Sequence, residues 1–174
     1  MLGVNLLFAG FALTLNGISY FTAVDNRIKA IANILVGIVI GTNAIIQTSG
    51  AAELGFFWEF GFAAAMWLFS LNYFIIAAHI LLKADNWKIF GIFSGFATLV
   101  SLIFMGETIW LVLNDAEGIA VMIYLWAMWM VLWLQSFLAI FVPSIDKYSP
   151  HTLIANGIAS TFIPGALILL GIIL

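Results

Sequence analysis

Three tryptophans in one apolar stretch are the residues of this chain best suited to recognise a ligand. The stretch YLWAMWMVLWLQSF covers residues 124–137, and its indole rings belong to Trp126, Trp129 and Trp133. At about 100° per residue, positions i, i+3 and i+7 lie on one face of a helix. Flat rings on one face can form the wall of a narrow slot, and each indole N–H can donate a hydrogen bond to a small polar molecule. Packing against neighbouring helices is the competing interpretation of this face.

The same face extends beyond the tryptophans. Met122 and Ser136 continue it at either end, whereas Gln135 is expected on the opposite side of the helix. Stripping water from a carbonyl or amide costs ~2–7 kcal/mol, and well-placed N–H donors would offset that cost while an apolar wall still excludes ions. Planar molecules such as urea suit a slot of this kind.

Ionisable groups that could move ions or protons are almost missing from the apolar stretches. Glu107, in FMGETIW, is the only carboxylate that falls well inside one of them. The chain has no TVGYG-like filter, no series of arginines and no acid–base pair, which ion and proton pathways normally need. The apolar stretches therefore suit a neutral passenger or none. Glu107 itself is either an interfacial residue near the outer end of its span or a transport residue.

The sequence does not indicate a metal site or a catalytic site. The chain has no cysteine, so it has neither a disulfide framework nor a thiolate metal site. The spacing of His79, His151, Asp85 and Asp146 supports no metal site, although all four are expected at the same membrane face. No nucleophile–base pair can be assembled, so an enzyme is disfavoured, and no cofactor or metal is expected. With a net charge of −3 and no basic run, nothing indicates nucleic-acid binding.

The elements that must position these residues are membrane-spanning helices. The chain is 65% hydrophobic and only 7% charged, whereas about 25% of a soluble domain is charged. Lipid offers no partners to backbone N–H and C=O groups, so helices are favoured, and the ~10-residue alternating segments of a barrel are not visible. We expect an all-α polytopic membrane protein, with residues 1–174 forming one six-helix bundle. The expected spans are about 2–23, 30–47, 58–82, 89–113, 119–142 and 151–173.

The charged residues between the spans predict an orientation. Every lysine and arginine falls in an odd-numbered connection, and basic residues concentrate on the cytoplasmic side. The second and fourth connections carry only acids as charged groups, so both termini are expected outside. The basic residues are Arg27, Lys29, Lys83, Lys88 and Lys147; the acids are Glu53 or Glu59, and Asp115 with Glu117.

Small polar motifs occur in the first and last spans. LNGI at 15–18 resembles ANGI at 155–158, so that Asn16 and Asn156 each precede a glycine. An internal repeat, which is common in transporters, and coincidence in a glycine-rich membrane protein are both open. The two asparagines, together with Met122, are candidates for solute selectivity.

Glycine and proline predict helix packing and bending. Gly37 and Gly41 in LVGIVIG form a G-x-x-x-G pair that lets helices approach closely, either within a subunit or between subunits. Pro164 in STFIPGAL predicts a kink in the sixth helix.

Five segments occur in a recognisable order along nearly the whole chain. They are MLGVNLLFAGFALTLNGI, TAVDNRIKAIANILVG, LFSLNYF, WAMWMVLWLQSF and NGIASTFIPG. In this order, and with six predicted helices, they resemble the AmiS/UreI family of urea and short-chain amide channels. The tryptophan pattern W-x-x-W-x-x-x-W is the most specific element of the resemblance.

The resemblance implies an assembly and a pore. Family members look like homo-hexameric rings in the bacterial cytoplasmic (inner) membrane, with termini outside, one pore in each protomer and lipid filling the central hole. Transferred by position, the pore wall would consist of Leu2, Leu6, Ala9, Leu13, Phe69, Tyr73, Trp126, Trp129, Leu132 and Trp133.

Three departures from the family's acid-gated urea channel follow from the same resemblance. That channel has a long outer loop with histidines, whereas no outer loop has a histidine here, so we expect no histidine-based acid gating. Asn156 stands where that channel has a glutamate, and Met122 stands where it has a further tryptophan. A neutral amide and a wider slot would shift the solute preference, for example towards an amide with a methyl group.

We therefore expect a passive channel for urea or short aliphatic amides. The alternatives are a proton-coupled small-solute transporter that uses Glu107, and a membrane assembly protein without a passenger.

Overall fold

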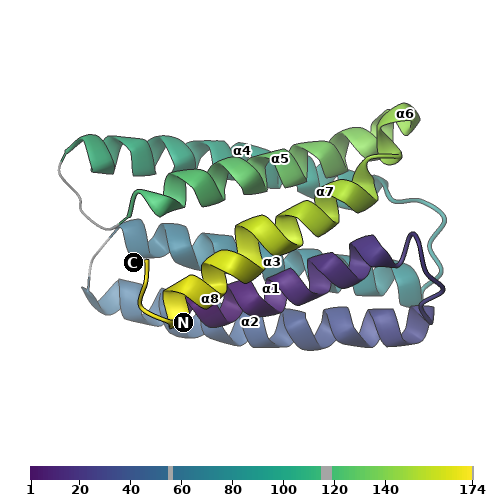
Figure 1. Cartoon of the computed structure of the whole chain (residues 1–174), viewed down its shortest axis with the longest axis horizontal. Coiled ribbons are helices and arrows are strands. Elements are labelled where there is room, and N and C mark those ends of the chain that lie inside the picture. Colours follow the sequence, from purple (N-terminus) through teal and green to yellow (C-terminus); the bar gives the residue numbers. More distant parts are fainter. Residues whose placement is uncertain (55–56, 115–118, 174) are drawn as a thin grey trace.

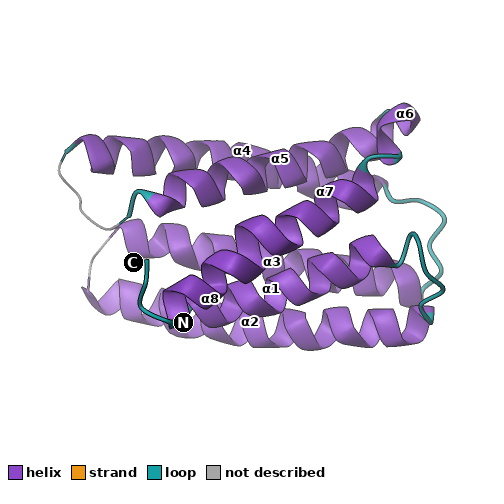
Figure 2. Cartoon of the chain, in the orientation of Figure 1, coloured by secondary structure: helices purple, strands orange, loops and turns teal. Residues whose placement is uncertain are grey.

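Three antiparallel helix pairs build the protein (Figure 1). The structure is a computed structural model that describes residues 1–54, 57–114 and 119–173, with the backbone alone described for 51–54 and 57–60. Its described part is helical, with short connecting turns (Figure 2). The helices are α1 (Leu2–Ile18), α2 (Asn26–Leu54), α3 (Phe57–Leu81), α4 (Lys88–Leu113), α5 (Val121–Phe141), α6 (Pro143–Asp146), α7 (Ser149–Ala155), the π-helix η1 (Asn156–Phe162) and α8 (Ile163–Leu169).

The six predicted spans are present, and some of their ends differ from the prediction. Five helical stretches are long and apolar enough to cross a membrane, and α1, with 17 residues, is at the lower limit of length. The first span was expected to reach residue 23 but ends at Ile18, where Ser19 Oγ donates to the carbonyl of Asn16 at 2.7 Å. Asp25 Oδ1 accepts from the backbone N–H of Arg27 at 2.7 Å, so α2 begins four residues earlier than expected.

The sixth span differs most from the prediction of one kinked helix. It runs as α7, η1 and α8 in succession, and a seven-residue π-helical segment lies just before Pro164. Its side chains satisfy some of the backbone carbonyls, because Thr161 Oγ1 donates to the carbonyl of Gly157 at 2.6 Å. This span crosses α1 in close contact (Figure 1).

Close helix contacts in the α2–α3 pair use the G-x-x-x-G motif. Ser70 Oγ donates to the carbonyl of Gly37 at 2.9 Å, and a Cβ at Gly41 would lie 2.8 Å from the same hydroxyl. The motif therefore serves contact within the subunit.

The two ends of the bundle differ in charge. The basic residues all lie at the end where α1, α3 and α5 finish, which we call the basic end. Both termini lie at the opposite end (Figure 1), which we call the acidic end. The acids that suggested this name, Asp115 and Glu117, lie outside the described residues, as do the side chains of Glu53 and Glu59.

Candidate functional site

An unbroken row of aromatic rings lies at the centre of the bundle. Trp126 and Trp129 meet edge to face, with ring centroids 5.1 Å apart. Phe69 on α3 contacts Trp129 at 5.2 Å and Trp133 at 5.4 Å. We call Trp126, Trp129, Trp133 and Phe69 the aromatic row. All four side chains are at most 4% exposed, so the row closes the centre of the bundle.

Two donors in the aromatic row have no partner. Nε1 of Trp129 and Nε1 of Trp133 are buried, and neither makes a hydrogen bond in the described structure. A buried donor without a partner costs about 1–3 kcal/mol. A water or a solute that enters the row could accept from both donors, which lie one helical turn apart.

Tyr73 ties the row to α1. Its ring stacks on Phe69 at 6.3 Å, and its hydroxyl donates to the carbonyl of Ala9 at 3.0 Å. The side chain is completely buried. The hydroxyl therefore has a partner, in contrast to the two indole nitrogens.

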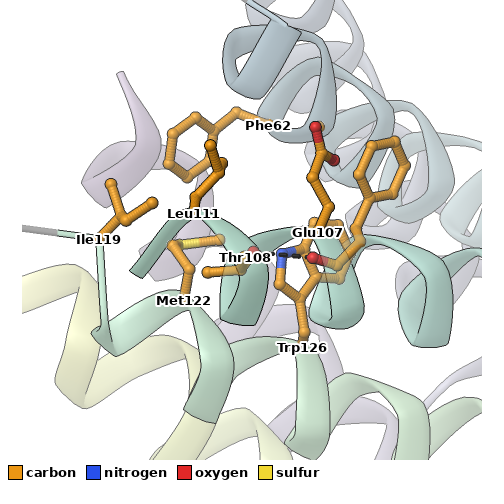
Figure 3. Close-up of a pocket in the computed structure, with 9 residues that line it drawn as sticks. Phe62, Glu107, Thr108, Leu111, Ile119, Met122 and Trp126 are labelled. Carbon is orange, nitrogen blue, oxygen red and sulfur yellow. Dashed lines mark hydrogen bonds between the residues drawn. The ribbon is translucent and has the colours of Figure 1, made fainter. Parts of the chain in front are cut away.

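A small pocket opens at the acidic-end side of the row (Figure 3). Its volume is about 20 Å³, which is room for about one water molecule. Thr108 Oγ1 donates to the carbonyl of Phe104 at 2.7 Å, and the Phe104 ring stacks on Trp126 at 5.3 Å. The lining residues are Gly61, Phe62, Phe104, Glu107, Thr108, Leu111, Ile119, Met122 and Trp126.

A much larger cavity of about 750 Å³ opens at the basic end. Its wall mixes charges of both signs with amides and hydroxyls. Desolvation, followed by the charge of Asp146, raises the pKa of the Tyr20 hydroxyl above its ordinary value. The polar lining residues include Asn16, Ser19, Tyr20, Lys29, Asp85, Asn86, Lys88, Gln135, Ser136, Asp146 and Ser149.

The aromatic row separates the pocket from the cavity. Trp126 lines the acidic-end pocket, and Ser136, ten residues further along α5, lines the basic-end cavity. Ten helical residues span about 15 Å. Trp129 and Trp133 thus lie between the two openings along α5, and Phe69 contacts both of these rings.

Comparisons with known proteins identify the chain at the level of a family. Residues 1–172 match the model of the AmiS/UreI family transporter. The chain belongs to the AmiS/UreI family. A comparison with curated proteins gave no match.

Two solved structures share the fold of this AmiS/UreI protein. A crystal structure of the urea channel from Helicobacter pylori aligns with a TM-score of 0.83 and 24% identity, over 100% of both chains. A cryo-EM structure of the Helicobacter pylori urea channel in its closed state aligns with a TM-score of 0.80 and 24% identity, over 98% of each chain. The predicted all-α, six-helix membrane fold is confirmed.

The wall residues expected from the AmiS/UreI resemblance gather at one place. Nine of the ten are buried, and the tenth, Leu2, is partly buried against the same cluster. Of the ten, Trp126 lines the acidic-end pocket, whereas the others pack between the pocket and the cavity or beside them. Their role as a pore wall remains a prediction.

The three selectivity candidates have different surroundings. Met122 lines the acidic-end pocket. Asn16 lines the basic-end cavity and exchanges two hydrogen bonds with Asn33, at 2.9 and 3.0 Å. Asn156 lines neither opening: its Nδ2 donates to the carbonyl of Thr152, and Ser160 Oγ donates to its Oδ1 at 3.0 Å. Asn156 thus makes its hydrogen bonds within its own span.

The sequence did not reveal the aromatic support of the row or the position of Gln135. Phe104 stacks on Trp126, and Phe93 meets Trp133 edge to face at 5.8 Å. The two phenylalanines are eleven residues apart, which places both on one face of α4. This spacing in the sequence could have indicated that they act together. The expectation for Gln135 was wrong, because its long side chain lines the same cavity as Ser136.

The histidines lie away from the acidic-end pocket. His79 stacks on Trp87 at 4.5 Å, and its ring nitrogens lie 2.9 and 3.1 Å from the carbonyl oxygens of Ile75 and Asn86. The ring of His151 contacts Phe21 at 5.6 Å. Within the described ranges, no cluster of three or more histidine, aspartate or glutamate residues suits a metal ion.

Proposed function

We propose that this AmiS/UreI protein is a passive channel for urea and short aliphatic amides, and that the solute crosses each protomer through the aromatic row. The pair of unpartnered indole donors, Trp129 Nε1 and Trp133 Nε1, carries the proposal. They are buried between two openings at opposite ends of the bundle. A carbonyl oxygen that enters the row would accept their hydrogen bonds and lose little on leaving water.

The solute class follows from the chemistry of the row and is supported by the relatives. Flat aromatic faces fit planar molecules, and donors without acceptors in the row suit a carbonyl group. The two solved structures of this fold are of a urea channel. A pore wall of Leu2, Leu6, Ala9, Leu13, Phe69, Tyr73, Trp126, Trp129, Leu132 and Trp133 is part of the proposal.

The orientation and assembly are also proposals. The basic end would face the cytoplasm of a bacterium, because basic residues concentrate on that side of the inner membrane, and both termini would lie outside. Protomers would form a homo-hexamer with lipid in its central hole, as the family resemblance implies. No energy source is required, since intracellular hydrolysis of the solute would maintain its gradient.

Stopped-flow light scattering on proteoliposomes tests the function. Vesicles that contain the protein are expected to re-swell faster in urea or acetamide gradients than protein-free vesicles of the same size. The channel function would be contradicted if, for both urea and acetamide, vesicles with the protein re-swelled at the same rate as protein-free vesicles.

A further inference from the structure

The acidic-end pocket contains a carboxylate without a protein partner. Glu107 is only partly exposed and lines the pocket (Figure 3), and in the described part of the chain it makes no hydrogen bond or ion pair. No lysine, arginine or histidine is among the lining residues, because the basic residues lie at the other end. A carboxylate near the end of a membrane span is costly without hydrogen-bond donors. Water or a solute can supply these donors.

The other polar groups of the pocket complete a pattern of donors and acceptors. Thr108 uses its hydroxyl hydrogen on the carbonyl of Phe104, so this hydroxyl can only accept from the pocket. The indole nitrogen of Trp126 points into the pocket in Figure 3 and offers an N–H. The pocket therefore has acceptors at Glu107 and Thr108 and a donor at Trp126.

This pattern fits urea better than a simple amide. Urea can direct one N–H from each nitrogen away from its carbonyl, and these two parallel bonds match the two oxygens of a carboxylate, as an arginine fork does. The carbonyl of urea then faces the opposite way, where an indole N–H can donate to it. Acetamide has a methyl group in place of one nitrogen, so it offers only one N–H to the same carboxylate.

We propose that Glu107 is the recognition group of the acidic-end pocket, where it accepts a two-pronged hydrogen bond from urea and makes the channel prefer urea to monoamides. The proposal rests on the channel function argued above. The pocket has room for about one water at present, so urea would enter as the flexible side chain of Met122 moves aside. Urea would then pass from Glu107 to the indole donors of the row.

Guanidinium is the probe for this fork, because it is planar, has the shape of urea and pairs with carboxylates through the same two N–H bonds. We expect millimolar guanidinium chloride, present on both sides of proteoliposomes, to inhibit urea flux through the unmodified protein. Glu107→Gln is expected to weaken that inhibition and to raise the half-saturation concentration of urea by roughly fivefold to tenfold, since a charge-assisted bond is about twice as strong as a neutral one. The half-saturation concentration of acetamide should change less, so the Glu107→Gln variant should prefer urea less strongly than the unmodified protein does.

Asp85→Asn is the matched control, because it removes one carboxylate from the basic-end cavity instead. Guanidinium inhibition should persist in this variant, and inhibition lost equally in both variants would overturn the proposal. The proposal is also overturned if guanidinium does not inhibit the unmodified protein, or if Glu107→Gln lowers urea and acetamide flux equally.

Proton coupling would be favoured instead if Glu107→Gln abolished all flux and if flux through the unmodified protein depended on an imposed proton gradient. That result would overturn the proposal as well. Unmodified protein that passes neither solute would reject the channel function itself, and the role of Glu107 with it.

Discussion

The unpartnered indole N–H of Trp129 lowers the stability of the protein, and a phenylalanine could pack at this position without that penalty. Trp129→Phe keeps an aromatic ring in the row and removes the buried donor. Removing the unpaired buried N–H removes a cost of about 1–3 kcal/mol, and this gain offsets part of the stability lost with the packing of the larger ring. The free energy of unfolding of the variant should therefore change little. Urea permeability should fall by roughly threefold to tenfold, because one hydrogen bond to the solute is lost. Thermal unfolding in detergent and stopped-flow swelling measure the two effects.

Trp110→Phe is the control for this prediction, since Trp110 is 63% exposed on the outer face of α4. Both its stability and its permeability should match those of the unmodified protein. A Trp129→Phe variant that loses stability but keeps full permeability would assign Trp129 to packing.

Tyr73, in contrast, has its hydroxyl satisfied by the protein. Tyr73→Phe removes the hydrogen bond to the carbonyl of Ala9 and should lower the free energy of unfolding by about 0.5–1.5 kcal/mol. Tyr148→Phe is the control, because Tyr148 is 52% exposed at the basic end. Thermal unfolding of the two variants in the same detergent gives the comparison. Equal melting temperatures would mean that the bond to Ala9 contributes nothing to stability.

At the scale of elements, glycines explain how the sixth span crosses α1. A Cβ at Gly10 would lie 2.7 Å from the carbonyl oxygen of Gly157, and one at Gly3 would lie 2.9 Å from that of Gly165. The two glycines of α1 are seven residues apart, whereas their partners are eight apart. The π-helical segment η1 contains Gly157 and ends before Gly165, and its wider turn takes up the additional residue, so both glycine pairs stay in contact. The π-helix therefore maintains the register of the crossing.

Gly10→Ala should disrupt this crossing. The added methyl group would meet backbone atoms of Gly157 and Phe162 at 2.7 and 2.9 Å, and neither can move without shifting the span. We expect a loss of about 1–3 kcal/mol or more, as for other overpacked sites. Gly106→Ala is the control, because nothing lies within 4 Å of a Cβ there, and it should be neutral or raise stability by up to about 1 kcal/mol. Size-exclusion profiles and melting temperatures in detergent distinguish the two, and equal behaviour would argue against the close crossing.

The sequence predicted the spans well and their details less well. Length and hydropathy locate apolar helices, because lipid leaves the backbone no other partners. The helical spacing of Trp126, Trp129 and Trp133 correctly predicts that they lie together. The π-helix could not be predicted. It depends on the glycine contacts between α1 and the sixth span, which are spaced seven residues apart in one helix and eight in the other, and only the structure shows which glycines meet. Nor could the position of Gln135 be predicted, because a long side chain can reach around its helix.

The charge distribution of the whole molecule makes its two ends chemically different. The basic-end cavity has lysines and aspartates in its wall, whereas Glu107 is the only charged residue that lines the acidic-end pocket in the described structure. In the proposed channel, a solute that approached from the acidic end would meet a narrow opening first and would leave through a wide, polar one. Selection at this entrance would suit a channel whose solute is consumed inside the cell, as proposed above.

The same distribution predicts how the channel responds to external acid. Histidine titrates near pH 6.5 when unperturbed, and it is the usual switch between pH 7 and pH 5. The chain has two histidines, His79 and His151, and both lie near the basic end, away from the acidic-end pocket. External acid therefore has no histidine to charge at the proposed entrance, so urea permeability should not rise between pH 7 and pH 5. Stopped-flow swelling of proteoliposomes across this range, with the internal pH held at 7, measures it. A steep rise in urea permeability across this range would contradict the prediction of a channel without histidine-based acid gating.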